Sequence, residues 1–596
     1  MLDVLAAQPR SLSLARAEEL LSQRIYTEPG HFLAELLQNA DDAGARSWRV
    51  TFTEDTVEVR HDGAPFDVRD VVGVLSIGQT TKVAGHIGLF GVGFKSVYAV
   101  CERPRIYSDV FAFEIADVSL PRPLARRPQG GGTTLVLPLR QPDDPERGAA
   151  ALAARARALP AQLLLTLQSL QTIEVEDPRG RRRVTRRLGT GDDRVELVDE
   201  VDARVVRRGF LVAAARADVA RGPGDEVLVA VALDAQGQPM GWPAGEPSVH
   251  AFLPTRQASG LDCLIHARFA VPVDRERIDP DDPGNHAALD RAGGLLGTLV
   301  RRRVEAGLDV RSLMAVAPRR AVVAPFDRVA LAFQEAVLDV PWLPDAQGRP
   351  TTPAAAWLVP DAALAGVLGA APGRRPVAPL PPALAAVARD LGARPLEAAD
   401  LAGLLRQAAD PQAAWLVDAM PVILRFVARE RWPVDGLRAL RLLPDGRGGL
   451  HPPSEILRAD AELRALAGPR RALLAPELEA DLHLAPLWAR LGVAALTPDD
   501  VLADLAADAA AIVARAGAGR VLRWLAGRPA SALEQVREAA LVPDERGHLR
   551  QARGPHAVFL PADGPLGGWL RRLEARPRWS TRPSRPARAT CCGASA

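Results

Sequence analysis

A glycine-rich segment, GHIGLFGVGF at residues 85–94, restricts the possible structures of this chain more than any other stretch, and it runs directly into KSVYAV. Gly88, Gly91 and Gly93 leave backbone N–H groups uncovered just before a stretch with a helical pattern. Such groups attract anions, because they lack partners within the helix and lie at the positive end of its dipole. Glycine clusters also form tight turns, and this one has neither P-loop spacing nor the dinucleotide-binding frame. Its meaning therefore depends on the rest of the chain.

The composition indicates a folded protein of several domains. A chain of 596 residues is too long for one core, so we expect about two to four domains. A hydrophobic fraction of 48% with 24% charged residues is typical of globular protein. The net charge of +2 gives no global electrostatic case for nucleic acid. The only lysines, Lys82 and Lys95, flank the glycine-rich segment, which favours an ammonium group there over a guanidinium.

Neither the cysteines nor the apolar segments indicate secretion or membrane insertion. No cysteine lies in a C-x-x-C pair or in a His/Cys cluster with zinc-site spacing. The first residues, MLDVLAAQPRSLSLARAEEL, lack a basic start followed by a long apolar run, and no uncharged apolar stretch reaches about 18 residues. We therefore expect a cytoplasmic protein without a membrane segment. The cysteines are Cys101, Cys263, Cys591 and Cys592.

Residues 1–148 mix helical and strand patterns. Residues 31–43, HFLAELLQNADDA, place apolar side chains at helical spacing, with Pro29 near the start and Gly44 after the end. SWRVTF and TVEVRH read as two strands joined by the turn TED. The order predicts an α+β domain, a sandwich in which helices cover a mixed sheet. Further helical patterns lie at 66–78 and 94–100, and strand patterns at 105–109, 110–116 and 133–139.

Two further regions follow. Residues 149–305 contain the strand patterns TIEVED, RRGFLVAAA and EVLVAVAL, which predict a second α+β domain. Residues 306–575 are rich in alanine, leucine, proline and arginine and are mostly helical in pattern. Residues 576–596 read as a disordered tail.

The C-terminal region contains a recurring turn. Pro344, Pro444 and Pro543 each follow two apolar residues and precede Asp-x-x-Gly, at spacings of 100 and 99 residues. This motif is typical of a turn between short strands. We therefore predict three repeats of about 100 residues. Independent turns in a proline-rich chain are the alternative.

Three polar residues share one face of the predicted helix at 31–43. Glu35, Asn39 and Asp42 stand at positions i, i+4 and i+7. Oxygen ligands such as the Asn39 amide can hold a hydrated Mg²⁺ together with nucleotide phosphates. Glu35, one turn away, could orient or deprotonate an attacking water. Taken alone, a solvated polar face is the alternative.

Two other short segments carry candidate ligands for a nucleotide base. In RHDGAPF, Asp62 could accept a hydrogen bond from an exocyclic amine, and Gly63 would let the backbone approach a flat ring. An ordinary Asp-Gly turn is the alternative. In GGGTTLVLPL, Thr133 or Thr134 offers a hydroxyl at the start of a strand.

In this order and spacing, ELLQNADDA, DGAPF, GLFGVGFKSVY and GTTLVL resemble the four nucleotide-binding boxes of the GHKL superfamily. That superfamily includes gyrase B, MutL, histidine kinases and the heat-shock protein 90 chaperones. The likeness is greatest to the heat-shock protein 90 branch, especially to bacterial proteins with a sacsin-type N-terminal ATP-binding domain. It is strong over residues 20–140 and weaker up to about residue 300. It implies a Bergerat-type fold for the first domain, with ATP and Mg²⁺ as ligands.

The resemblance implies a role for each matching residue. Glu35 matches the general base, Asn39 the magnesium ligand and Asp42 the conserved acid one turn on. Asp62 matches the adenine-reading aspartate, with Gly63 beside it. The commoner family pattern, Asp-x-Gly-x-Gly, would instead place His61 in that position, which an adenine amine would not favour. Thr133 matches the threonine that supports the aspartate.

The remaining matches concern the phosphates. Residues 76–86, with Lys82, resemble the mobile lid that folds over ATP. In FAVPVDRERI, Arg275, with Arg277 in reserve, resembles an arginine that reaches the γ-phosphate and stabilises transition-state charge. Surface ion pairs are the alternative for these arginines. The phosphate loop is matched by Gly88, Phe90, Gly91, Val92, Gly93, Phe94 and Lys95.

We therefore expect an ATP hydrolase with chaperone-like or conformational-switch activity that acts on client or partner proteins. Glu35, together with the lack of an upstream helical segment with a phospho-acceptor histidine, disfavours a histidine kinase. One alternative is an ATP-binding regulatory or defence scaffold with negligible turnover. Another is a DNA-linked GHKL ATPase, against which the balanced charge argues. The sequence specifies neither the client nor the oligomeric state.

Overall fold

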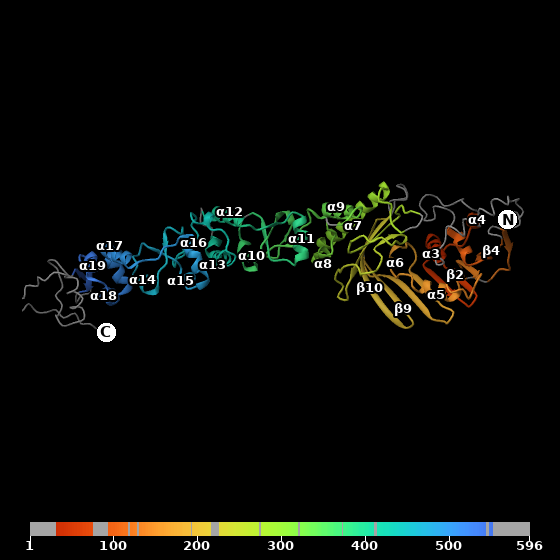
Figure 1. The fold of residues 1–596 in the computed structure, drawn as a ribbon, viewed down its shortest axis with the longest axis horizontal. Helices are drawn as coiled ribbons and strands as arrows, with labels where there is room; N and C mark the ends of the chain where they lie inside the picture. Colours follow the sequence, from red (N-terminus) through yellow and green to blue (C-terminus); the bar gives the residue numbers. More distant parts are fainter. Residues whose placement is uncertain are drawn as a thin grey trace, which may run out of the picture. The chain divides into compact units, whose positions relative to one another are not determined.

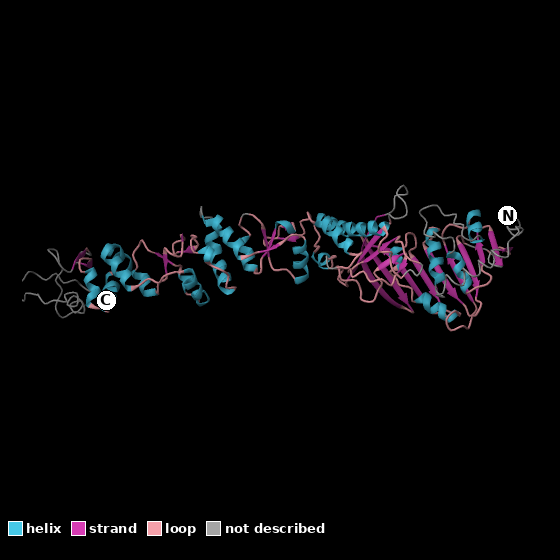
Figure 2. Cartoon of the chain, turned by 45° about the horizontal axis from the view of Figure 1, so that its top comes forward, coloured by secondary structure: helices cyan, strands magenta, loops and turns pink. Residues whose placement is uncertain are grey.

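A computed structural model describes residues 31–75, 93–116, 120–127, 130–191, 193–215, 226–272, 276–319, 322–371, 373–409, 414–543 and 548–551. The chain forms two compact units, one mainly up to Leu343 and the other mainly from Pro344 onward. The segments Pro350–Ala354 and Pro381–Ala393 belong to the first unit. Long strands gather in the first unit, whereas helices, loops and short strands make up the second (Figure 1, Figure 2). The predicted domain boundaries at residues 148, 305 and 575 stay predictions.

The first unit is built on one mixed sheet, in which 14 strands are described. Among these described strands, only the neighbouring pairs β1–β7 and β12–β14 are parallel. The predicted α+β class is confirmed, and the β1–β7 pair carries one large mixed sheet across residue 148, where the sequence predicts two separate α+β domains. In spatial order the strands are β13 (Leu253–Pro254), β12 (Val249–Ala251), β14 (Leu264–Ala267), β11 (Val227–Leu233), β10 (Arg204–Ala215), β9 (Arg194–Val201), β8 (Arg182–Gly189), β7 (Thr172–Glu176), β1 (Ser47–Phe52), β2 (Thr56–His61), β6 (Thr133–Pro138), β3 (Arg105–Ser108), β4 (Phe111–Ala116) and β5 (Leu120–Pro123).

Helices bury an apolar face against one side of this sheet. In α3 (His31–Asp42), Phe32, Leu33, Leu36 and Leu37 recur at helical spacing and pack into the core with residues of β1 and β2. Each such burial contributes about 1.5–3 kcal/mol, so packing against the sheet stabilises this short helix. The other helices described in this unit include α4 (Val68–Leu75), η1 (Gly93–Ala99), α5 (Ala149–Arg157), α6 (Leu163–Thr166), α7 (Pro283–Glu305), α8 (Arg311–Ala315), α9 (Asp327–Val337) and α11 (Pro382–Asp390).

Most of the predicted elements before residue 148 are confirmed. Both strands of the first hairpin have the predicted bounds, and the helix at 31–43 is α3. The helix predicted after the glycine-rich segment is a 3-10 helix, η1, rather than an α-helix. Its seven residues exceed the roughly three to four that a 3-10 helix usually has.

The opposite face of the sheet carries cross-strand ion pairs in which the arginine side chains are exposed, while acidic partners such as Glu174 are buried. Glu174 lies between two guanidinium groups, at 2.6 Å from Arg49 and 2.5 Å from Arg182. Because their arginines are exposed, each pair adds little to stability, but opposite charges keep the open face from exposing a large apolar surface. The other pairs on this face are Arg105–Glu114, Arg186–Glu200 and Arg207–Glu196.

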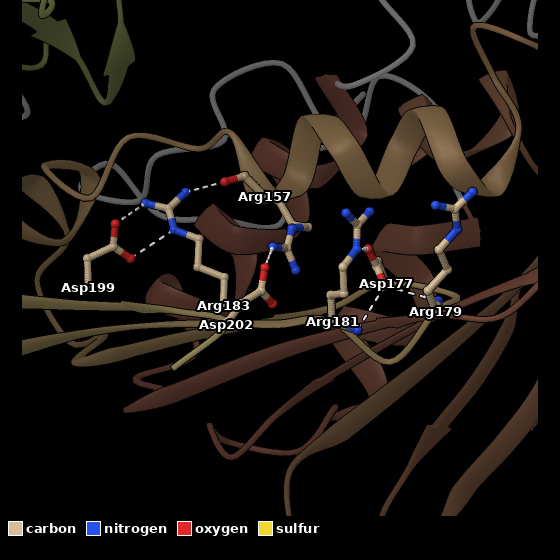
Figure 3. Close-up of polar contacts among 7 residues, drawn as sticks. All are labelled: Arg157, Asp177, Arg179, Arg181, Arg183, Asp199 and Asp202. Carbon is tan, nitrogen blue, oxygen red and sulfur yellow. Dashed lines mark hydrogen bonds and ion pairs between the residues drawn. The ribbon is translucent and has the colours of Figure 1, made fainter. Parts of the chain in front are cut away.

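Polar contacts also fasten the end of α5 to the β8–β9 hairpin (Figure 3). Arg183 forms two contacts with Asp199, at 2.8 and 2.9 Å, and donates to the backbone carbonyl of Arg157. The Arg157 side chain in turn lies 2.8 Å from Asp202. The arginines at this end of the sheet therefore serve the packing of a helix on a hairpin.

One type of aspartate turn recurs in both units. The carboxylate accepts the N–H groups two and four residues further on, and a glycine three residues on adopts a positive φ that other residues rarely take. The predicted turns at Pro344 and Pro444 are of this type, but its presence in the first unit shows that the turn alone does not mark a repeat. The aspartates are Asp177, Asp234, Asp345 and Asp445, and the glycines are Gly180, Gly237, Gly348 and Gly448.

A longer order of elements recurs in the second unit. β17 (Ala356–Leu358), α10 (Ala362–Leu368) and β18 (Arg375–Val377) form a strand, a helix and a parallel strand. The same order follows at β22 (Ile456–Leu457), α14 (Ala461–Leu466) and β23 (Ala472–Leu473). Both helices begin at an aspartate N-cap, which supports the prediction of repeats. Three repeats remain a prediction, since most of the third lies outside the described residues.

The other elements of the second unit are mainly helices. None of the described helices of the chain is long and apolar enough to cross a membrane. The remaining elements comprise β19 (Arg394–Pro395), α12 (Ala398–Ala409), α13 (Ala414–Arg429), β20 (Leu443–Pro444), β21 (Leu450–His451), α15 (Pro476–Glu479), α16 (Ala485–Leu491), α17 (Pro498–Ala516), α18 (Ala518–Ala526), α19 (Ala530–Leu533), β24 (Ala540–Pro543) and β25 (Leu549–Gln551).

Candidate functional site

Helix α3 carries the three polar residues singled out in the sequence. Glu35, Asn39 and Asp42 all lie within this one helix, so the predicted shared face follows from its geometry. Glu35 is only 6% exposed, and Asn39 and Asp42 are half-buried. Carboxylates are almost never buried to this degree without partners or a function. The solvated polar face is therefore a poor description of Glu35.

A polar row lies at one end of the helix-covered side of the sheet. His61 of β2 is the register partner of Trp48 in β1 and of Thr133 in β6, and Thr133 is the partner of Ser108 in β3. These three residues are buried: His61 is 7% exposed, and Thr133 and Ser108 are each 1% exposed. We call His61, Thr133 and Ser108 the polar row. The next row toward the sheet interior is wholly apolar and consists of Val50, Val59, Leu135 and Ile106.

Hydrogen bonds fix the hydroxyl groups of the polar row. The Ser108 and Thr133 hydroxyls lie 2.6 Å apart, and Ser108 Oγ also accepts the Phe66 N–H at 2.8 Å. Thr134, the other candidate threonine, follows on the opposite face, since successive residues of a strand alternate in direction. Of the two threonines, Thr133 is therefore the one on the same side of the sheet as α3.

The side chains of His61 and Asp62 differ in exposure and in their hydrogen-bond partners. Asp62 is exposed, and its Oδ1 accepts the backbone N–H groups of Arg46 and Ser47 at 2.8 and 2.9 Å. His61 is buried, and burial lowers its pKa to about 4 despite the nearby Asp62 carboxylate. Its Nδ1 accepts the Gly63 N–H at 3.3 Å, which leaves the proton of the neutral ring on Nε2.

Two glycines allow the chain to pack closely behind the polar row. A Cβ on Gly63 would lie 2.7 Å from the carbonyl oxygen of Ala43, just past the end of α3. A Cβ on Gly132 would lie 1.9 Å from the carbonyl oxygen of His61, and its φ of +77° already favours glycine. Within the described structure, Gly63 is therefore required by close packing of two backbone segments. The sequence alone suggests close approach to a nucleotide base instead.

The described residues include only the end of the predicted phosphate loop. Gly93, Phe94 and Lys95 belong to η1, which packs against α3. The Lys95 ammonium is buried and donates to the carbonyl oxygen of Val74, at the end of α4, at 2.8 Å. Residues 76–86 with Lys82, together with Gly88, Phe90, Gly91, Val92 and Arg275, lie outside the described residues. Arg277 is described and exposed.

A hollow of about 510 Å³ lies elsewhere, beside the β7–β8 and β9–β10 turns. Arg181 and Arg182 line it, but the first pairs with Asp177 (Figure 3) and the second with Glu174. Their charges are already balanced, so we do not assign a ligand to this hollow. Within the described part of the chain, no group of three or more His, Cys, Asp or Glu side chains could hold a metal ion. A magnesium ion held by Asn39 and phosphates does not require such a group.

Two contributors to this region were not singled out in the sequence. Ser108 lies in a short strand without a motif, and only the register of β3 with β6 brings it to Thr133. Asp41 lies between Asn39 and Asp42 in the sequence, is 4% exposed, and accepts three backbone N–H groups from residues 168–170. Its partners are too distant in sequence for a local pattern to reveal them.

Comparisons with known proteins give distant relatives. No family model matches the chain. It is 28% identical to Protein NO VEIN of Arabidopsis thaliana over 331 residues, which covers 49% of this chain and 12% of that protein. It is 31% identical to human (Homo sapiens) sacsin over 104 residues, which covers 14% of this chain and 2% of sacsin. The chain thus spans only a small part of either relative.

Among solved structures, the similarity is weaker. A crystal structure titled as the N-terminal domain of a DNA repair protein aligns with 44% of this chain and 92% of its own, at 12% identity and a TM-score of 0.29. Similarity at this level carries no conclusion about function.

Proposed function

We propose that the first unit binds ATP and Mg²⁺ and hydrolyses ATP in the manner of the GHKL superfamily, as a conformational switch or chaperone-like module. The observation that carries the proposal is the burial of Glu35 on the side of the sheet where the polar row replaces apolar residues. Withdrawing a carboxylate and an imidazole from water costs free energy, so such groups are retained where they serve a purpose such as binding a ligand. The similarity to sacsin agrees with the sacsin-type motifs of the sequence.

The donor set on α3 suits the proposed ligands. The Asn39 amide oxygen is a hard ligand of the kind that Mg²⁺ accepts, with the remaining positions filled by phosphate oxygens and water. Magnesium would supply charge neutralisation at the phosphates. Glu35, one turn from Asn39, would orient and deprotonate the attacking water.

We propose that His61, rather than Asp62, meets the base. His61 lies on the side of the sheet that α3 covers, whereas the Asp62 carboxylate is engaged with the backbone at Arg46 and Ser47. A neutral imidazole with Nδ1 engaged offers an N–H donor, which would suit a ring nitrogen of adenine better than its exocyclic amine.

The proposal is tested by equilibrium binding of ATP with and without Mg²⁺. The wild-type chain should bind ATP in a magnesium-dependent manner, and Asn39→Ala should weaken that binding about tenfold or more. Glu58→Gln is the matched control, because Glu58 lies on β2 but faces the open side. Binding that is absent, or equal in Asn39→Ala and the wild type, would overturn the assignment.

A further inference from the structure

We propose that Asp41 is a positioning residue that joins α3 to the far half of the sheet through the segment Gln168–Leu170. The inference rests on the proposed function only for the significance of α3, which carries Glu35 and Asn39. The linkage itself follows from contacts between described residues.

Both oxygens of the Asp41 carboxylate accept backbone N–H groups. Oδ2 accepts the Gln168 N–H at 2.9 Å, and Oδ1 accepts those of Ser169 and Leu170 at 2.8 and 2.9 Å. Asp41 is 4% exposed, and hydrogen bonds to an ionised acceptor in such surroundings are among the strong ones. An acidic residue in the last turn of a helix is disfavoured by the helix dipole. Its place in α3 is therefore explained by residues 168–170 and not by helix stability.

A second charged side chain, Arg187, binds the carbonyl groups of the same connection. The Arg187 guanidinium of β8 donates to the carbonyl oxygens of Leu164 at 2.8 Å, of Leu167, and of Gln168 at 3.2 Å. The connection before β7 is thus held by its N–H groups from α3 and by its carbonyls from β8. It cannot shift relative to α3 without breaking several charge-assisted hydrogen bonds.

The Gln168 side chain carries the linkage further. Its Nε2 donates to both oxygens of Glu226, at 2.5 and 2.6 Å, just before β11. Arg268, just after β14, lies 3.4 Å from the same carboxylate. Glu226 is 9% exposed, so little water competes for these contacts. A continuous polar path therefore runs from Asp41 through Gln168 to Glu226 and Arg268.

Two roles for Asp41 predict different results: coupling of α3 to Glu226, and hydrogen bonding to the buried N–H groups of residues 168–170 alone. If Asp41 only satisfies the segment 168–170, its loss loosens that segment and lowers overall stability. If Asp41 couples α3 to Glu226, a change at Glu226 must also alter local opening of α3, and this effect must require Asp41. Coupling between two sites is measured by such a double-mutant cycle.

The test is hydrogen–deuterium exchange of the full chain without nucleotide, in the wild type, Asp41→Asn, Glu226→Gln and the double variant. Asp41→Asn should speed exchange about tenfold at residues 168–170 and in the last turn of α3. Glu226→Gln should speed exchange in α3 about threefold in the wild type and leave it unchanged in the Asp41→Asn background.

Asp177→Asn is the matched control, because the Asp177 carboxylate also accepts backbone N–H groups, from Arg179 and Arg181, but far from α3 along the chain. It should loosen its own turn and leave α3 unchanged. If Asp41→Asn fails to fold, Gln168→Met retains the backbone contacts and should abolish the effect of Glu226→Gln on α3.

An equal effect of Glu226→Gln on α3 in both backgrounds would overturn the coupling, as would unchanged exchange of α3 in Asp41→Asn. These measurements contain no ATP, so a failure of ATP binding would remove the proposed function without deciding the linkage. If ATP is hydrolysed, Asp41→Asn should lower kcat/KM, because it displaces the helix that carries both Glu35 and Asn39, although it removes no contact to substrate.

Discussion

The two faces of the large sheet differ in how their polar residues are paired, although both contain buried ones: Glu174 on the open face is 6% exposed and lies between two arginines. On the open face, charged side chains such as Arg186 and Glu200 pair with one another and remain in contact with water. On the helix-covered face, His61, Thr133 and Ser108 are withdrawn from water although their neighbours are apolar. Forming or losing an exposed ion pair changes the free energy of folding little, whereas burying a polar group raises it. We therefore assign function to the covered face and a structural role to the open face.

Acidification should destabilise the chain more than any substitution considered below, because it charges buried histidines. Burial lowers the pKa of His61 and His250 to about 4 and that of His266 to about 3. The unfolded chain binds these protons more readily, so stability is complete above about pH 6.5 and falls as the pH drops toward 4. Each histidine accounts for a few kcal/mol, since a tenfold difference in proton affinity between the two states corresponds to about 1.4 kcal/mol.

Denaturant midpoints measured between pH 7 and pH 4 check this prediction. The midpoint should fall steeply below pH 6.5 and less steeply in His250→Gln and His61→Gln. A midpoint independent of pH over this range would show that the histidines are not neutral in the folded chain.

A pair of adjacent threonines compares the two faces directly. Thr133→Val removes a hydroxyl that meets Ser108 on the covered face, and should lower the free energy of unfolding by about 1–3 kcal/mol. It should also weaken ATP binding, since the polar row loses a member. Thr134, on the opposite face of β6, is also buried (8% exposed), but its hydroxyl has no hydrogen-bond partner among the described residues, so Thr134→Val should change stability by about 0.5 kcal/mol or less. Equal losses of stability in the two variants would remove the distinction between the faces.

Replacing His61 tests how the base is read. His61→Asp exchanges a donor for an acceptor, so the preference for ATP over ITP should rise about tenfold, since only adenine presents an exocyclic amine. Competition binding of the two nucleotides measures the ratio. Asp62→Asn should leave the ratio unchanged while loosening the turn at Arg46 and Ser47. If Asp62→Asn changed the ratio and His61→Asp did not, Asp62 would be the residue that contacts the base.

Substitutions on the open face should have the weakest consequences. A double-mutant cycle between Arg186 and Glu200, both 42% exposed in their side chains, should give a coupling energy of about 0.2–1 kcal/mol that declines with salt. ATP affinity should not change in either variant. A coupling above about 2 kcal/mol would mean that this face contributes more to stability than exposed pairs normally do.

Helices and strands whose apolar residues recur at regular spacing could be predicted from the sequence. Strands rich in charged residues could not. α3, β1 and β2 follow from apolar spacing alone. β8 and β9, with the sequences RRVTRRLG and RVELVDEV, were not predicted, because charged side chains occupy half of the positions of both strands. β5 contains two prolines and can pair only as an edge strand.

The candidate site was predictable only where its residues are neighbours in sequence. Glu35 and Asn39 share a helix turn, so their spacing identifies them. The alternation Val57, Val59, His61 already places His61 on the buried side, a signal that the family motif obscured. Asp41 could not be predicted, because its partners lie more than 120 residues away, at Gln168 to Leu170.

Steady-state hydrolysis of Mg·ATP by the wild type, Glu35→Gln and Glu58→Gln decides whether the buried carboxylate of α3 is catalytic. We expect turnover that Glu35→Gln lowers about 100-fold or more, as for loss of a general base, while ATP binding persists and Glu58→Gln behaves as the wild type. Turnover that is absent in the wild type, or is equal in Glu35→Gln and Glu58→Gln, would contradict the assignment of Glu35 on the covered face as the catalytic carboxylate.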